Sequence, residues 1–127
     1  MRALPLIALL PLTACTPPVA EVPADRVPAA QVAGPALSCI DTQRIRNTRV
    51  HGNRTIDFQM VGKETYRNTL PYTCPELGFE ERFAYSLAIP RLCSTDIVTV
   101  LHSDGSRGAS CGLGEFVPVT MDPRDRP

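Results

Sequence analysis

The chain has 127 residues, with 13 basic and 13 acidic side chains, 13 prolines, five cysteines and no tryptophan. This length provides one domain at most. The balanced charge excludes the strong positive field that attracts nucleic acid, so we expect no nucleic-acid partner.

The N-terminus is a short apolar segment that ends at a cysteine. Arg2 supplies a positive charge and residues 3–12 form an apolar run, which is too short to span a bilayer because a spanning helix needs about 20 residues. The following letters, LTAC, resemble the lipobox of bacterial lipoproteins, whose small side chains admit the backbone to a protease and whose cysteine accepts lipid. The resemblance implies a signal peptide over residues 1–14 and a mature chain that begins at lipidated Cys15. The alternative is an ordinary secretory signal that contains a chance cysteine.

The residue after this cysteine bears on localisation. In lipoproteins of this kind, an aspartate there retains the protein in the inner membrane, whereas this chain has Thr16. The resemblance therefore implies an outer-membrane anchor of palmitate-type acyl chains, with the domain facing the periplasm. Several acyl chains anchor a protein far more firmly than one.

Residues 15–38 are predicted to be a tether. Residues 16–38 contain five prolines and no aromatic residue, and each proline removes a backbone donor and fixes φ. This composition favours a polyproline-like or disordered segment with a reach of up to roughly 70 Å. The alternative is an N-terminal arm that packs on the domain.

Residues 39–120 are predicted to form a β domain. Period-two alternation places Ile56, Phe58 and Met60 on one face of residues 55–60, and residues 82–88 alternate in the same way. Residues 96–101 are almost continuously apolar, which predicts a central strand buried on both faces. The other predicted strands are residues 45–50, 64–70 and 109–117, with helical turns near residues 40–45 and 75–77. The pattern predicts a mainly β fold, a small antiparallel barrel or sandwich of about six strands with minimal helix. Residues 121–127 are predicted to be a disordered tail.

The cysteines predict two disulfides. If Cys15 is acylated, four remain in a small domain that would face an oxidising compartment, where disulfides are usual. Four cysteines allow three pairings, of which we favour Cys74 with Cys93 and Cys39 with Cys111. A zinc site or redox pair is the alternative, but no two cysteines have the close Cys-x-x-Cys spacing that such sites normally use. We predict neither a metal nor another cofactor.

Several longer motifs carry a family resemblance. The letters CIDTQRIRNTRV, YRNTLPYTCPEL, RLCSTDIVTVL and SCGLGEF resemble a family of small, uncharacterised proteobacterial lipoproteins that contain a domain of unknown function. The resemblance covers residues 39–119. Family members commonly have glycine where this chain has Thr95. The resemblance implies an exported, disulfide-containing β domain and supplies no catalytic residues.

The histidines do not predict a catalytic site. His51 and His102 both fall at predicted turns. His102, Asp104 and Ser106 lie within five residues of one loop, whereas the members of a working triad converge from separate parts of a fold. We therefore interpret both histidines as solvated loop residues.

Two charged clusters are candidate binding sites. The acidic cluster in the GFEERF region could bind a cation, but a solvated loop is the simpler interpretation; its members are Glu76, Glu80 and Glu81. The basic cluster at the start of the domain consists of Arg44, Arg46, Arg49 and Arg54. If these arginines share a face, they could bind the phosphates of lipopolysaccharide or the carboxylates of peptidoglycan stem peptides. The alternative is the solvent face of an edge strand, where charge prevents aggregation.

The sequence therefore predicts an envelope lipoprotein whose domain binds an envelope protein or polymer, or supports an assembly, without catalysis. An inhibitor or accessory factor of a periplasmic or cell-wall enzyme is the alternative. An enzyme is less favoured, because two turn histidines and disulfide-bonded cysteines leave few reactive groups.

Overall fold

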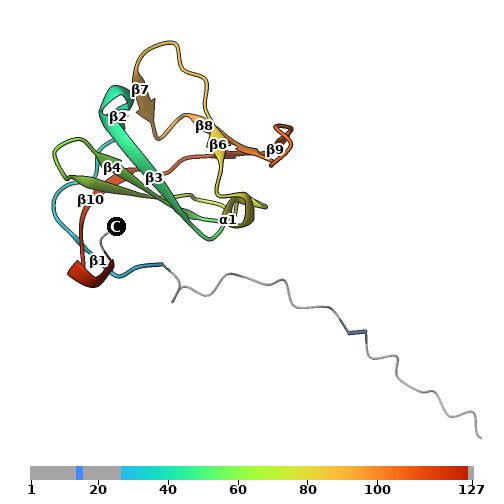
Figure 1. The fold of residues 1–127 in the computed structure, drawn as a ribbon, viewed down its shortest axis with the longest axis horizontal. Coiled ribbons are helices and arrows are strands. Elements are labelled where there is room, and N and C mark those ends of the chain that lie inside the picture. The colour runs from blue at the N-terminus through green and yellow to red at the C-terminus, as the bar shows by residue number, and fades with distance from the viewer. Residues whose placement is uncertain (1–13, 16–26, 126–127) are drawn as a thin grey trace, which may run out of the picture.

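The structure is a computed structural model that describes residues 14–15 and 27–125, which fold into three antiparallel sheets (Figure 1). The five-stranded sheet has the order β1 (Ala30–Val32), β10 (Phe116–Met121), β5 (Thr65–Thr69), β4 (Thr55–Met60), β3 (Ile45–His51). The three-stranded sheet has the order β6 (Phe83–Ala84), β8 (Ile97–Leu101), β9 (Arg107–Gly112), and the third sheet pairs β2 (Cys39–Asp41) with β7 (Arg91–Cys93). Within residues 27–125, helix is limited to α1 (Leu77–Glu80) and to the short 3-10 turns Thr42–Arg44 and Pro123–Asp125. The predicted mainly β fold is confirmed, and its described part is an open sandwich rather than a closed barrel. In the same part, no helix has the length and apolar character needed to cross a membrane.

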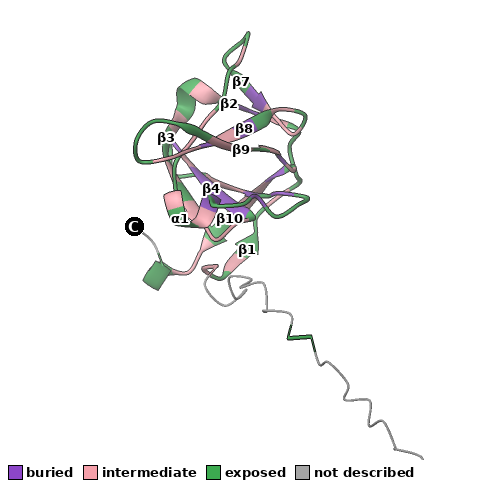
Figure 2. Cartoon of the chain, turned by 90° about the vertical axis from the view of Figure 1, so that its right-hand side faces the viewer, coloured by how far each residue is buried: buried purple, intermediate pink, exposed green. Residues whose placement is uncertain are grey.

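The hydrophobic core lies between the sheets, where the buried segments of the two layers face one another (Figure 2). The predicted alternation of β4 is confirmed, because Ile56, Phe58 and Met60 all belong to the core. Phe58 and Phe116 are fully buried and pack edge to face, with ring centroids 5.5 Å apart. Aromatic pairs in this geometry stabilise a core beyond the area that they bury.

Three predicted strands differ from the observed ones. Of residues 82–88, only β6 is a strand, because β8 pairs with Phe83 and Ala84 alone. The predicted strand over residues 109–117 is two strands, because β9 pairs with β8 in one layer and β10 pairs with β5 in the other. The chain changes layers between them. β8 is central in its sheet as expected, but it is buried on one face only, since Ile97 is 58% exposed.

Part of the predicted tether belongs to the sheet. β1 pairs with β10, with Ala30 opposite Met121 and Val32 opposite Val119. Farther along, Leu37 and Phe116 exchange two backbone hydrogen bonds of 2.8 and 2.9 Å. The alternative of a packed arm is therefore the correct one for these residues, and the rest of the predicted tether, residues 16–26, lies outside the described residues. At the other end, β10 and the final 3-10 turn extend into the predicted tail.

Two disulfides are present, as predicted, but the predicted pairing is wrong. Cys39 bonds to Cys93, and Cys74 bonds to Cys111. Pairing of β2 with β7 sets Cys39 directly opposite Cys93, with Cα atoms 4.0 Å apart, so Cys93 is not free to reach Cys74. The second disulfide joins the segment between β5 and α1 to β9.

Candidate functional site

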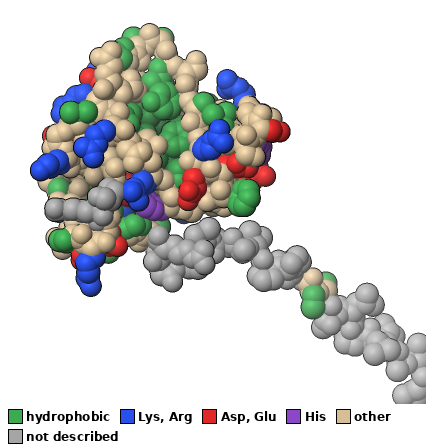
Figure 3. Space-filling view, in the orientation of Figure 1, with side chains coloured by type: hydrophobic (Ala, Val, Ile, Leu, Met, Phe, Trp, Pro, Cys, Tyr) green, Lys and Arg blue, Asp and Glu red, His purple; other side chains and the backbone are tan. Residues whose placement is uncertain are grey.

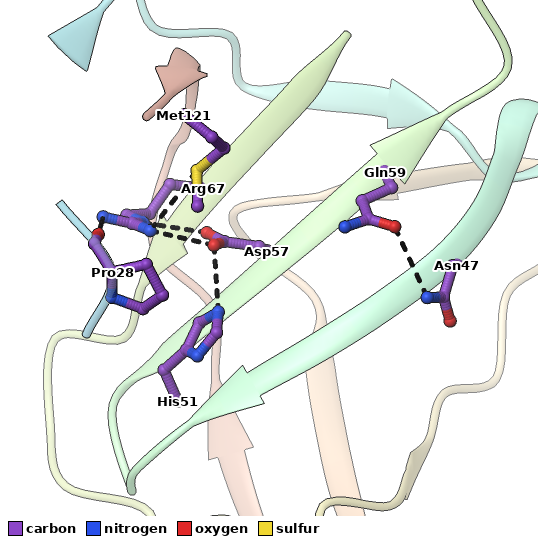
Figure 4. Close-up of polar contacts among 7 residues, drawn as sticks. All are labelled: Pro28, Asn47, His51, Asp57, Gln59, Arg67 and Met121. Carbon is purple, nitrogen blue, oxygen red and sulfur yellow. Dashed lines mark hydrogen bonds and ion pairs between the residues drawn. The ribbon is translucent and has the colours of Figure 1, made fainter. Parts of the chain in front are cut away.

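The outer face of the five-stranded sheet carries a buried charge cluster, which we call the Asp57 cluster (Figure 4). Asp57 lies opposite Arg67 in the β4–β5 register. The Arg67 guanidinium donates two hydrogen bonds to the Asp57 carboxylate, from Nε at 2.8 Å and from Nη2 at 2.9 Å. His51 Nε2 lies 3.0 Å from the same carboxylate. Only 2% of the Asp57 side chain is exposed.

The two ends of the described domain cover the Asp57 cluster. Arg67 Nη1 donates to the carbonyl of Pro28 at 2.9 Å, and Nη2 lies 3.8 Å from the sulfur of Met121 (Figure 4). Alternation alone would place Asp57 on a solvent-facing side of the strand. It is buried instead because the segment before β1 and the end of β10 close over the face.

Asp57 remains charged in this setting. Burial would raise the pKa of Asp57, but hydrogen bonds from Arg67 and His51 outweigh it and hold the pKa below its ordinary 3.8. A carboxylate held by a guanidinium fork is poorly suited to act as a free general base. In the described ranges, no hydroxyl or thiol is hydrogen-bonded to His51. The Asp57 cluster therefore joins β3, β4, β5 and the N-terminal segment as a structural cross-link.

The position of His51 corrects the expectation of a solvated turn residue. His51 is the last residue of β3, and 15% of its side chain is exposed. Asp57 and Arg67 were not singled out by the sequence analysis. The signal that could have found them is the hairpin turn at Gly62, since a hairpin centred there places Asp57 opposite Arg67.

The four arginines of the basic cluster do not converge on one site. Arg44 donates to the Val61 carbonyl at 3.1 Å and lies 3.8 Å from Glu64. Arg54 donates to the carbonyls of Leu70 and Pro71. These two arginines therefore hold turns of the backbone.

The other two arginines lie on an edge strand. Arg46 and Arg49 are exposed, and neither forms an ion pair or a side-chain hydrogen bond within residues 27–125. β3, which carries both, ends the order of the five-stranded sheet. This arrangement matches the edge-strand alternative, in which charged side chains guard an exposed edge.

Arg46 also lines a cavity of about 380 Å³ at one end of the sheet. Lys63 is the second cation of this cavity and Glu64 its anion, while Gln59 and Thr65 add polar groups. Arg44 lines a separate cavity of about 180 Å³. The larger cavity is of the size that small ligands occupy, and its two cations could hold a carboxylate.

Two members of the acidic cluster, Glu76 and Glu80, contact His102. His102 Nδ1 lies 3.2 Å from Glu80 Oε1, and His102 Nε2 lies 3.5 Å from Glu76 Oε2. The hydrogen bond with Glu80 raises the pKa of His102 above its ordinary 6.5, against a smaller opposing effect of desolvation, and the nearby carboxylates add to the rise. The third member, Glu81, is exposed at the end of α1. The pair with His102 therefore connects α1 to the loop that follows β8.

The loop that contains His102 forms no triad. Asp104 Oδ1 accepts hydrogen bonds from the hydroxyl and the N–H of Ser106, at 2.6 and 2.8 Å, and these bonds lower the pKa of Asp104. The His102 ring faces the glutamates of α1. In the described part of the chain, no three His, Cys, Asp or Glu side chains are placed to hold a metal ion.

Four of the five cysteines are in disulfides. Cys39, Cys74, Cys93 and Cys111 form the two disulfides, while Cys15 is exposed and is not in a disulfide. Comparison of the chain with protein-family models, with curated proteins and with solved structures finds no match.

Proposed function

We propose that this chain is a lipid-anchored protein of the bacterial envelope whose β domain binds a partner without catalysis. The observation that carries the anchor is the division of the cysteines, since Cys15 follows an apolar N-terminal segment and stays outside both disulfides. The lipobox resemblance and Thr16 support an anchor in the inner leaflet of the outer membrane, with the domain facing the periplasm. The resemblance to small proteobacterial lipoproteins belongs to the same proposal.

The side-chain chemistry supports binding over catalysis. The buried charges of the Asp57 cluster satisfy one another, and the two disulfides leave no reactive thiol in residues 27–125. An inhibitor or accessory factor is the second candidate, and a protruding loop closed by a bond between Cys74 and Cys93 would have favoured it. That bond is not formed, because Cys74 pairs with Cys111. Binding of an envelope partner is therefore the function that we favour.

Metabolic labelling tests the anchor. The full chain is expressed in a Gram-negative bacterium that is fed an alkynyl palmitate, and the membrane fraction is analysed for label and for the mass of the N-terminal peptide. We expect label on a peptide that begins at Cys15, and complete loss of label in Cys15→Ser. Thr16→Ser is the matched control, and it should keep the label. An unlabelled wild-type chain, or label that survives Cys15→Ser, would contradict the proposal.

A further inference from the structure

We infer that the free edge of β3 binds an extended peptide segment of a partner, in which acidic and apolar residues alternate. The segment would add a strand to the five-stranded sheet, a mode in which main-chain hydrogen bonds give affinity and alternate side chains give specificity. This inference deepens the proposed binding role by naming the chemistry of the partner.

The hydrogen-bond pattern shows which backbone groups of β3 are free. The N–H of Met60 donates to Glu64 at 2.8 Å, and the N–H of Leu70 donates to Arg54 at 2.7 Å. In an antiparallel ladder, bonding to the two neighbours alternates along a strand. The even-numbered residues of β4 therefore bond to β5, and the odd-numbered ones bond to β3. In the β3–β4 register these odd-numbered residues face Asn47, Arg49 and His51.

It follows that Thr48 and Val50 direct their N–H and C=O groups away from β4. No backbone hydrogen bond outside the β3–β4 ladder uses either residue within the described chain. An exposed strand edge with unused donors and acceptors is a template for pairing with another strand. The edge thus offers four backbone groups at two adjacent pairing positions.

A second segment without backbone partners joins β6 to β7. Residues 85–88 follow β6 with strand-like alternation, but their backbone forms no hydrogen bond with the described residues. The segment leads to Pro90, whose carbonyl accepts from the N–H of Thr42 at 3.1 Å, just before β3 begins. Its ends are therefore tied to β8 and to the start of β3.

Apolar side chains are exposed between the edge and this segment. Figure 3 shows an apolar stripe between β3 and the chain that joins β6 to β7. Tyr85 and Ile89 from that chain are 38% and 61% exposed. Val50, from the inward face of β3, and Leu87 are partly buried against the core. A strand added to β3 would cover these side chains with alternate residues of its own.

Charge on the outer face of β3 determines which residues should alternate with the apolar residues of the partner segment. Arg49 lies opposite Asp57 in the register and therefore on the outer face, where Asp57 is already neutralised by Arg67. Arg46 lies where the β3–β4 register shifts between Ile45 and Asn47, so it joins Arg49 on the face of Gln59, and both Arg46 and Gln59 line the larger cavity. Residues of an added strand that point to this face would meet two unpaired guanidinium groups, which favours Asp or Glu. Residues that point to the opposite face would meet the apolar stripe.

The same charges disfavour a second copy of this chain as the occupant. If two copies of β3 paired antiparallel through the outward groups of both Thr48 and Val50, Thr48 of one copy would lie opposite Val50 of the other, and Arg49 would lie opposite Arg49. Like charges directly opposite each other destabilise a strand pair. Because β3 has seven residues, the matching segment of a partner would have about five to seven residues.

The probe is a fluorescent peptide with the sequence Glu-Val-Glu-Leu-Glu-Val-Glu, acetylated and amidated, which is titrated with the purified full chain in detergent by fluorescence anisotropy. The control peptide replaces each Glu with Lys. We expect one-to-one binding of the acidic peptide, with no binding of the basic one. The double variant Arg46→Gln/Arg49→Gln should bind at least roughly tenfold more weakly, while Arg91→Gln/Arg107→Gln, on exposed positions of other strands, should bind normally.

The variant Thr48→Pro tests the edge itself. Proline removes the outward N–H and spares the bonds to β4, so binding should weaken roughly tenfold, whereas Thr48→Val keeps the N–H and should bind normally. If Thr48→Pro does not fold, hydrogen exchange of the wild-type chain tests the edge instead. The bound acidic peptide should then protect the amides of Thr48 and Val50 from exchange. Equal binding of the basic peptide, unprotected amides, or sedimentation that shows self-association through β3 would overturn the inference. If these results overturn the inferred peptide partner while lipid is still found on Cys15, the proposed lipid anchor is unaffected.

Discussion

Replacing Arg67 with methionine would test whether the Asp57 cluster holds the sheet together. The substitution keeps an unbranched side chain on β5 but removes the two hydrogen bonds to Asp57 and the one to the Pro28 carbonyl. His51 would be the remaining partner of a carboxylate whose side chain is 2% exposed. Breaking a buried ion pair by removing one member costs about 3–5 kcal/mol, because it leaves an uncompensated charge. In a domain of this size, such a loss lowers the melting temperature by roughly 15–30 °C.

The matched control is Arg49→Met, which removes a guanidinium from the position opposite Asp57 on the neighbouring strand. Arg49 is exposed, so its loss should change the free energy of unfolding by less than about 0.5 kcal/mol. Urea denaturation at neutral pH measures both variants. Equal midpoints for the two would refute the reasoning that Arg67 compensates a buried charge.

Acidification gives a second measurement of the same cluster. Because the pKa of Asp57 is lower in the folded chain than its ordinary 3.8, the pairing stabilises the fold above that value and is lost as pH falls through the lowered pKa. Wild-type stability should therefore fall below about pH 4. The difference in the free energy of unfolding between the wild type and Arg67→Met should become smaller over the same pH range, because a protonated Asp57 has no charge for the guanidinium to compensate.

Two further predictions concern a close backbone contact and a titrating contact. A Cβ at Gly114 would clash with the Thr69 carbonyl oxygen, whereas one at Gly112 meets nothing within 4 Å. Urea denaturation should show Gly114→Ala to be destabilised by about 1–3 kcal/mol and Gly112→Ala to be nearly neutral, and equal stabilities would contradict the close contact. The bond with Glu80 raises the pKa of His102, so the contact stabilises the α1 region fully below pH 6.5 and is lost as pH rises through the raised pKa. An NMR titration of the His102 ring proton should give a pKa above 6.5 that drops in Glu80→Gln, and an unchanged pKa in that variant would contradict the assignment.

Local patterns predicted the parts of this fold that depend on local chemistry. β4 begins and ends where the alternation of residues 55–60 places it, since apolar side chains at every second position are buried wherever one face of a strand meets a core. The same alternation in residues 82–88 yields a strand of two residues, because a strand also needs a partner and β8 pairs with only Phe83 and Ala84. Periodicity describes a segment, whereas pairing depends on residues far away in the sequence.

The candidate site shows the same limit. The disulfide pairing depends on β2 lying beside β7, and residues 39 and 93 are 54 positions apart. The burial of Asp57 depends on Pro28 and Met121, which come from opposite ends of the domain. The cysteine count correctly predicted two disulfides and the alternating patterns a mainly β fold, but neither carries information on which distant segments meet.

The sheet order has a mechanical consequence. β1 and β3 are the two opposite edges of the five-stranded sheet. If Cys15 is anchored in the membrane, the chain from the anchor enters the domain at the β1 edge, whereas the proposed partner strand adds at the β3 edge. The two attachment points are then four strand spacings apart, about 19 Å. A pull between partner and membrane would run across the strands, through successive ladders of hydrogen bonds, and the bonds of Arg67 to Asp57 and Pro28 lie along that line of force.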